Sequence, residues 1–95
     1  MTAGKKIECI KEKLSRYRKV TSKVLAELEF SKGISAKDRC VAEEFLQNAK
    51  CYFEDSIYFE SQGDKLRALA AVSYAHAWLD AGVVAGFFGK FHYHL

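Results

Sequence analysis

The sequence lacks proline altogether and contains no long hydrophobic run in its 95 residues. Because proline is the strongest breaker of an α-helix, its absence permits long uninterrupted helices. No apolar stretch approaches the roughly 18–20 residues that span a bilayer, so we expect no contact with a membrane. The N-terminal stretch MTAGKKIECI carries charges but not the apolar core of a secretory signal, and we therefore expect a cytoplasmic protein.

Cysteine is scarce, and its spacing excludes the commonest cysteine-based sites. The three cysteines are Cys9, Cys40 and Cys51, and no C-x-x-C pair occurs among them. This argues against a zinc site or a thioredoxin-like redox motif, and we expect three reduced, partly buried thiols. A glycine-rich phosphate loop is also missing, because the C-terminal glycines follow a predicted helix rather than a strand. We accordingly expect no cofactor.

Composition and charge indicate one small globular domain over residues 1–95. Hydrophobic residues make up 49% of the chain and aromatic residues 14%, which is typical of a folded core. The formal net charge is +3, but residues 1–23 hold eight Lys or Arg and two Glu, a net +6. The other residues therefore carry a net −3, and this asymmetry raises the question of an acidic partner.

Hydrophobic periodicity predicts a first long helix. Apolar and semi-polar residues recur in alternating steps of three and four from Ile7 to Leu28, which defines one helical face. We expect this helix over about residues 5–30. The stretch SKGIS then breaks the pattern, since Gly33 suits a left-handed helix end and Ser35 suits the cap of a following helix.

Two further helices complete the predicted fold. The second is expected over about residues 36–61 and the third over about 65–85, followed by a tail over 86–95. Between them the stretch SQGD supplies Gly63 as a helix end and Asp64 as a helix cap. Because this turn is short, the second and third helices form an antiparallel hairpin. The sequence therefore predicts an all-α protein, an antiparallel up-and-down three-helix bundle with a short C-terminal tail.

The apolar faces of the later helices suggest what packs where. The predicted inner face of the second helix consists of Val41, Phe45, Asn48, Tyr52, Asp55 and Phe59. Leu46, Ala49, Phe53 and Ile57 broaden that face, as contact with two neighbours requires. The third helix is apolar on every side, whereas a helix of a three-helix bundle should have one side exposed to solvent. We expect an additional partner for it: the C-terminal tail, a second copy of the chain, or another protein. The candidate interface residues are Trp78, Val83, Val84, Phe87 and Phe88.

Polar residues in the predicted interior form a candidate layer. In the stretch SYAHAWLDAG, a histidine and an aspartate lie four residues apart on an otherwise apolar helix. Antiparallel register places this histidine level with polar residues of the other two helices. The predicted layer comprises Tyr17, Asn48, Tyr52, Ser73 and His76, with Asp80 one turn further on. Residues in such a cluster can hydrogen-bond to one another and fix the register of the bundle. We therefore favour a structural role for this layer over a binding site.

The same residues admit a sharper interpretation as a binding site. His76 and Asp80 could supply two metal ligands, and His92 and His94 of the tail could complete the set. A small molecule held by His76, Asp80 and Tyr52 is the related alternative. A His–Asp pair can also act as a general base, but no oxyanion hole is identifiable, and we expect no enzyme.

Basic residues on the first helix form a candidate charged face. Arg16, Lys19 and Lys23 make a contiguous outward stripe. Its simplest interpretation is a solvated helix face with internal ion pairs. Binding of an acidic protein or of nucleic-acid phosphates is the alternative, although no interleaved aromatic residues or known motif support nucleic acid.

Two stretches also resemble a known family. The stretches YFEDSIYFESQGD and YAHAWLDAGVVAGFF are similar to the archaeal domain-of-unknown-function family 357, over the second half of the second helix and the third helix. The resemblance implies a cytoplasmic archaeal three-helix bundle and no assigned activity. The sequence departs from the family pattern at Ala77, where the family has glycine. The residues that match the pattern are Asp55, Tyr74, His76, Trp78, Asp80 and Gly82.

Together these features lead to three hypotheses about function. The first is a non-enzymatic module that self-associates, as a homodimer, or binds another protein through the third helix and the tail. The second is a protein that binds a metal or small molecule at the layer around His76 and Asp80. The third is nucleic-acid binding by the basic first helix.

Overall fold

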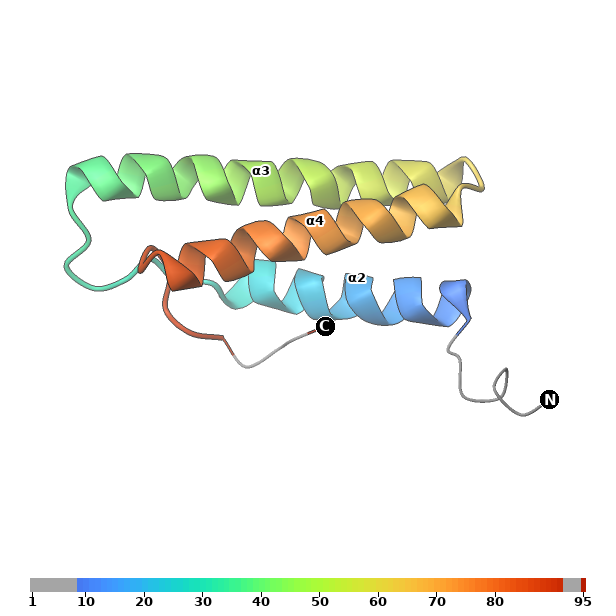
Figure 1. The fold of residues 1–95 in the computed structure, drawn as a ribbon, viewed down its shortest axis with the longest axis horizontal. Coiled ribbons are helices and arrows are strands. Elements are labelled where there is room, and N and C mark those ends of the chain that lie inside the picture. The colour runs from blue at the N-terminus through green and yellow to red at the C-terminus, as the bar shows by residue number, and fades with distance from the viewer. Residues whose placement is uncertain (1–8, 92–94) are drawn as a thin grey trace.

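A computed structural model describes residues 9–91 and residue 95 of the chain. Over this part the structure contains three α-helices: α2 (Ile10–Glu27), α3 (Ala36–Ser61) and α4 (Lys65–Val84). The helices run up, down and up, with α4 lying between the other two (Figure 1). α4 packs against both α2 and α3, whereas α2 and α3 barely touch. The predicted all-α three-helix bundle is confirmed, and α4 is its central helix.

The helix ends follow the predicted capping chemistry. Ser35 Oγ accepts a hydrogen bond of 3.1 Å from the backbone N–H of Asp38 at the start of α3. Asp64 caps α4 in the same way, because its Oδ1 accepts from the N–H of Arg67 at 3.0 Å. Such caps satisfy amides that have no partner within the helix. Gly63 follows the end of α3 with a positive φ of 79°, as predicted for a helix end. Gly33 also has a positive φ, 73°, but it lies in the connection six residues after the end of α2, so its predicted role as a helix end is wrong.

The first helix is shorter than predicted at its C-terminal end. α2 ends at Glu27, and Leu28 already has an extended backbone with ψ 136°. The chain beyond it is drawn away from the helix axis, because Phe30 pairs with Phe88 in an antiparallel bridge. The heptad pattern predicted a helix to about residue 30. Its last member, Leu28, still packs against the core, although the helix has already ended. The predicted start at residue 5 lies outside the described residues.

Small residues form the seam between α3 and α4. They recur every seven residues along both helices and are buried: Ala42, Ala49 and Ser56 on α3, and Ala68, Ala75 and Gly82 on α4. Ser56 Oγ donates a hydrogen bond of 2.7 Å to the carbonyl oxygen of Ala68, which fixes the antiparallel register of the pair. Side chains of this size let the two helix backbones approach closely.

This seam corrects the predicted inner face of the second helix. Val41 and Tyr52 are each 37% exposed, and Asp55 is exposed as well. Ala49, which the prediction placed only on the flank of that face, lies at the centre of the contact with α4. The periodicity analysis favoured large apolar side chains for the interior, but the close helix contact selects small ones and rotates the large ones to its flank.

The larger apolar side chains fill two clusters where α2 meets α4. One cluster contains Leu14, Ala68 and Val72, with Phe53 and Phe59 packed against it. The other contains Val24, Ala49 and Leu79, with Leu25, Leu28, Leu46, Trp78 and Phe91 around it. No helix in residues 9–91 combines the length and the hydropathy needed to cross a membrane.

The segment after α4 folds back onto its own chain. Gly86 has a φ of 81°, and Phe87 N–H then donates to the carbonyl oxygen of Gly82 at 2.8 Å. Phe88 is only 3% exposed and packs on Phe30, with the ring centroids 5.8 Å apart. A Cβ atom at Gly82 would overlap the Phe88 ring, so glycine is required for this packing. The start of the tail therefore belongs to the core.

Candidate functional site

His76 is a buried polar group at the centre of the bundle. Its side chain is 2% exposed, and its Nδ1 lies 3.0 Å from Oγ1 of Thr21, a residue of α2 that is itself buried. The Phe91 ring stands edge-on to the imidazole, with the centroids 5.8 Å apart. On the solvent side, Asp80 Oδ1 lies 3.7 Å from His76 Nε2, and the Asp80 side chain is 53% exposed.

The partner of His76 is a residue that the sequence analysis did not assign to the polar layer. The sequence pattern places Thr21 only on the helical face predicted between Ile7 and Leu28. It follows the buried Leu14 by seven residues, so it occupies an equivalent position of the heptad pattern. A hydroxyl at such a position is a signal for a buried polar partner, because buried polar groups are nearly always hydrogen-bonded.

The structure does not bring the six predicted layer residues together. Tyr17 is half-buried in the apolar cluster around Leu14, and Asn48 is half-buried on α3. Ser73 Oγ donates to the carbonyl oxygen of Leu69 at 2.9 Å, within its own helix. Tyr52 lies on the outer side of the α3–α4 seam. The residues where the three helices meet are apolar instead, such as Val24, Ala49 and Leu79.

The donor set for a metal ion is small in the described residues. Within residues 9–91 and 95, no group of three or more His, Cys, Asp or Glu side chains is placed to hold a metal ion. His76 and Asp80 provide two nearby groups. His92 and His94, which the sequence analysis added to them, lie outside the described residues. Two ligands alone do not make a stable metal site.

The cysteines are more exposed than predicted. Cys9, Cys40 and Cys51 are all exposed and carry free thiols, whereas partly buried thiols were expected. Cys40 and Cys51 lie on the outer side of α3, away from the seam of small residues, because the contact with α4 selects a different face of that helix.

The basic face of α2 is exposed, as expected of a solvated stripe. Arg16, Lys19 and Lys23 are all exposed. The Arg16 guanidinium lies over the Tyr17 ring, 4.9 Å from its centroid. Arg18 points elsewhere and forms an ion pair of 2.6 Å with Glu60 near the end of α3.

The outer face of α4 is apolar over its whole length. This face consists of six uncharged, exposed residues that share one side of the helix: Leu66, Ala70, Tyr74, Ala77, Ala81 and Val84. The exposed fractions are 67% for Leu66, 59% for Tyr74 and 87% for Val84. We call these six residues the α4 face. The exposed part of α4 is thus rich in apolar residues, although Lys65, Arg67 and Asp80 are exposed on other sides of it, and the tail covers a further side.

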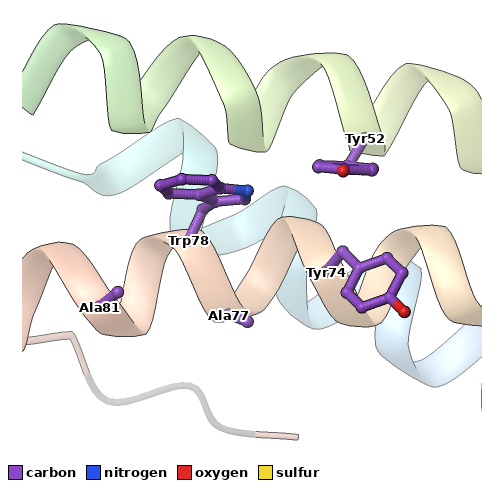
Figure 2. A pocket seen from close by; sticks show the side chains of 5 residues that line it. All are labelled: Tyr52, Tyr74, Ala77, Trp78 and Ala81. Atoms are coloured by element: carbon purple, nitrogen blue, oxygen red, sulfur yellow. The ribbon is translucent and has the colours of Figure 1, made fainter.

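An open groove runs along the α4 face toward α3. One hollow of about 280 Å³ is lined by Tyr52, Tyr74, Ala77, Trp78 and Ala81 (Figure 2). A second hollow of about 290 Å³ shares Tyr52 and Tyr74 and extends to Asp55, Phe59, Arg67, Ala70 and Ala71. The two tyrosine rings, 5.5 Å apart between centroids, line both hollows. We call this groove the α3–α4 groove.

The floor of the groove is held by aromatic packing. Trp78 points from α4 toward α3 (Figure 2), where its ring stands edge-on to Phe45 at 4.9 Å between centroids. Phe45 also meets Phe87 edge-on at 5.2 Å. Edge-to-face pairs of this kind add stability beyond the area they bury, so the floor of the groove is already formed in the single chain.

The five predicted interface residues do not form one surface, because they differ in exposure. Trp78 lines the groove, and Val84 is the most exposed large apolar residue of the α4 face. Val83 and Phe87 are half-buried, whereas Phe88 is buried in the core of its own chain and is not part of the surface. The sequence analysis did not assign Leu66, Ala70, Ala77 and Ala81 to a surface, although their helical spacing is the signal that would have grouped them.

A comparison with protein families finds a match over most of the chain. Residues 16–88 match the family described as "Protein of unknown function (DUF357)". The match covers α3, α4 and more than half of α2. Comparisons with curated proteins and with solved structures return no match. Of the residues quoted for the resemblance, Asp55, Tyr74 and Trp78 line the groove, and His76 and Gly82 are buried.

Proposed function

The chain belongs to the DUF357 family, and we propose that it is a non-enzymatic protein-interaction module that binds through the α4 face and the α3–α4 groove. One observation carries this proposal: an uncharged apolar helix face, with Leu66, Tyr74 and Val84 each more than half exposed, borders an open groove. Contiguous exposed apolar patches with polar rims are typical of protein-binding surfaces.

The energetics favour burial of this surface by a protein. Removing apolar area from water stabilises a complex by about 25 cal/mol per Å². Tyrosine and tryptophan are enriched at the energetic centres of interfaces, and Tyr52, Tyr74 and Trp78 lie together in this groove. Asp55 and Arg67 at one end supply polar groups for the rim.

The shape of the surface also favours a protein over a small ligand. Small-molecule sites are concave and enclose most of the ligand surface. The two hollows are open and shallow, and they line up along a helix, which suits an added helix. We also propose the cytoplasm as the location of the protein, a proposal supported by three exposed free thiols.

Site-specific photo-crosslinking in cells tests this proposal. A benzophenone amino acid replaces Tyr74 on the α4 face, and in a matched control it replaces Lys50, an exposed residue of α3. We expect an adduct of discrete mass from position 74, formed with a second copy or with another protein, and none from position 50. Equal labelling from both positions, or none from position 74, would overturn the proposal.

A further inference from the structure

We infer that the partner in the α3–α4 groove presents a lysine side chain, whose ammonium group is held by the rings of Tyr52 and Tyr74 and the carboxylate of Asp55. This inference rests on the proposed function and adds the chemistry of one anchor of the partner. It concerns the second hollow of the groove, of about 290 Å³, which extends from the two tyrosines toward the turn between α3 and α4.

Aromatic rings form much of the wall of this hollow. Tyr52 of α3 and Tyr74 of α4 meet across the groove (Figure 2), with 5.5 Å between the ring centroids and 53° between the ring planes. Phe59 supplies a third ring two turns further along α3. The face of an aromatic ring attracts ammonium groups, and sites for quaternary ammonium ligands combine several such rings. These walls therefore favour an apolar chain that ends in a cation.

A carboxylate lies in the same hollow. Asp55 is exposed and lies about one turn from both Tyr52 and Phe59 along α3. The ion pairs formed within residues 9–91 and 95 do not include Asp55. Its negative charge is thus open to a cation that enters between the rings.

Arg67 is a cation on the wall of this hollow, but another carboxylate balances its charge. Its Nε lies 3.5 Å from Oδ2 of Asp64, and its guanidinium lies 5.9 Å from the centroid of the Phe59 ring. Because Asp64 offsets Arg67, the charge of Asp55 leaves this end of the groove with a net −1. Charge complementarity therefore favours a cationic side chain of the partner over an anionic or neutral one.

The shape of the site suits lysine. A lysine side chain has an apolar four-carbon stem with a compact charge at its tip. Ala70 and Ala71 line the hollow and offer apolar contacts to the stem. The first hollow continues on the other side of the two tyrosines, so a partner segment can lie along the groove while one side chain enters the second hollow.

Amine probes test the chemistry of the hollow on the full chain. The probe is n-butylammonium, which reproduces the end of a lysine side chain, and its controls are neutral 1-pentanol and anionic pentanoate at the same ionic strength. In ¹H–¹⁵N NMR titrations we expect saturable shifts centred on Tyr52, Asp55 and Tyr74 with butylammonium, and weaker ones with both controls. Equal responses to butylammonium and 1-pentanol, or no saturable shift at these residues, would overturn the inference.

Paired substitutions at exposed positions separate the charge from the rings. Asp55→Asn removes the carboxylate charge, and Glu54→Gln removes a charge at the neighbouring position of α3. Tyr74→Leu keeps apolar bulk but removes the ring, which Tyr74→Phe retains. We expect Asp55→Asn and Tyr74→Leu each to weaken butylammonium binding about two- to five-fold, and the two controls to leave it nearly unchanged. Equal weakening by Asp55→Asn and Glu54→Gln would mean a general charge effect and would overturn the inference.

Crosslinking from position 74 separates this inference from the proposed function. We expect the crosslinked partner peptide to contain a lysine, and we expect Asp55→Asn, but not Glu54→Gln, to lower the adduct yield about two-fold or more. If the adduct forms equally well in Asp55→Asn, the proposed function stands and this inference fails. If no adduct forms although butylammonium binds, the proposed function fails, and the hollow binds a free amine rather than the lysine of a partner.

Discussion

His76 Nδ1 on α4 lies 3.0 Å from Thr21 Oγ1 on α2, and both side chains are almost completely buried. This contact is the polar tie between the first and last helices of the bundle, and it lies between the two apolar clusters. Because the imidazole is buried, loss of the hydroxyl would leave a ring nitrogen without the water that could replace it.

Thr21→Val should therefore destabilise the fold although it keeps the side-chain shape. We expect a loss of about 1–3 kcal/mol in the free energy of unfolding, the usual cost of an unsatisfied buried polar group. Urea denaturation followed by circular dichroism measures it. Thr21→Ser keeps the hydroxyl and should retain more stability than Thr21→Val, and Ser22→Ala at the exposed neighbour should cost little. Equal losses in Thr21→Val and Thr21→Ser would show that the hydroxyl does not matter.

Gly82→Ala should destabilise the protein by forcing Phe88 out of its place. The added Cβ would overlap the Phe88 ring, and overpacking of this kind costs roughly 1–3 kcal/mol. Thermal unfolding compares this variant with Gly89→Ala, at a position where the nearest atom lies 4.0 Å away. The double variant Gly82→Ala with Phe88→Ala should lose less than the sum of the two single losses. Strict additivity would contradict the contact.

Ala49→Leu should disrupt the seam between α3 and α4. Ala49 is fully buried where the two helices approach closely, so a larger side chain forces them apart at a cost of about 1–3 kcal/mol or more. Lys50→Leu adds a leucine at the adjacent exposed position and should change the unfolding free energy by less than about 0.5 kcal/mol. Urea midpoints of both variants check this, and similar stabilities would show that the seam tolerates bulk.

Local signals in the sequence predicted the architecture well. The boundaries of α3 and α4 follow from capping residues and glycines such as Ser35, Asp64 and Gly63, whose chemistry acts within one turn. The end of α2 was missed because the bridge between Phe30 and Phe88 is a contact across the whole chain, and periodicity does not record such contacts.

The centre of the α3 contact with α4 was missed for a related reason, since the prediction placed Ala49 only on the flank of the inner face. Periodicity identifies an apolar stripe, but α3 has two stripes, one of large residues such as Tyr52 and one of small residues such as Ala49. Which stripe packs inside depends on how closely α4 approaches, and this distance is a property of both helices. Of the stripe predicted to lie inside, Tyr52, Asp55 and Phe59 line the α3–α4 groove.

The measurement that tests the central claim most directly is photo-crosslinking with a benzophenone amino acid at position 74 of the α4 face. If the α4 face and the α3–α4 groove bind a protein, position 74 should give an adduct of discrete mass. The control position 50, an exposed site on α3, should give none. No adduct from position 74, or equal labelling from both positions, would contradict the account.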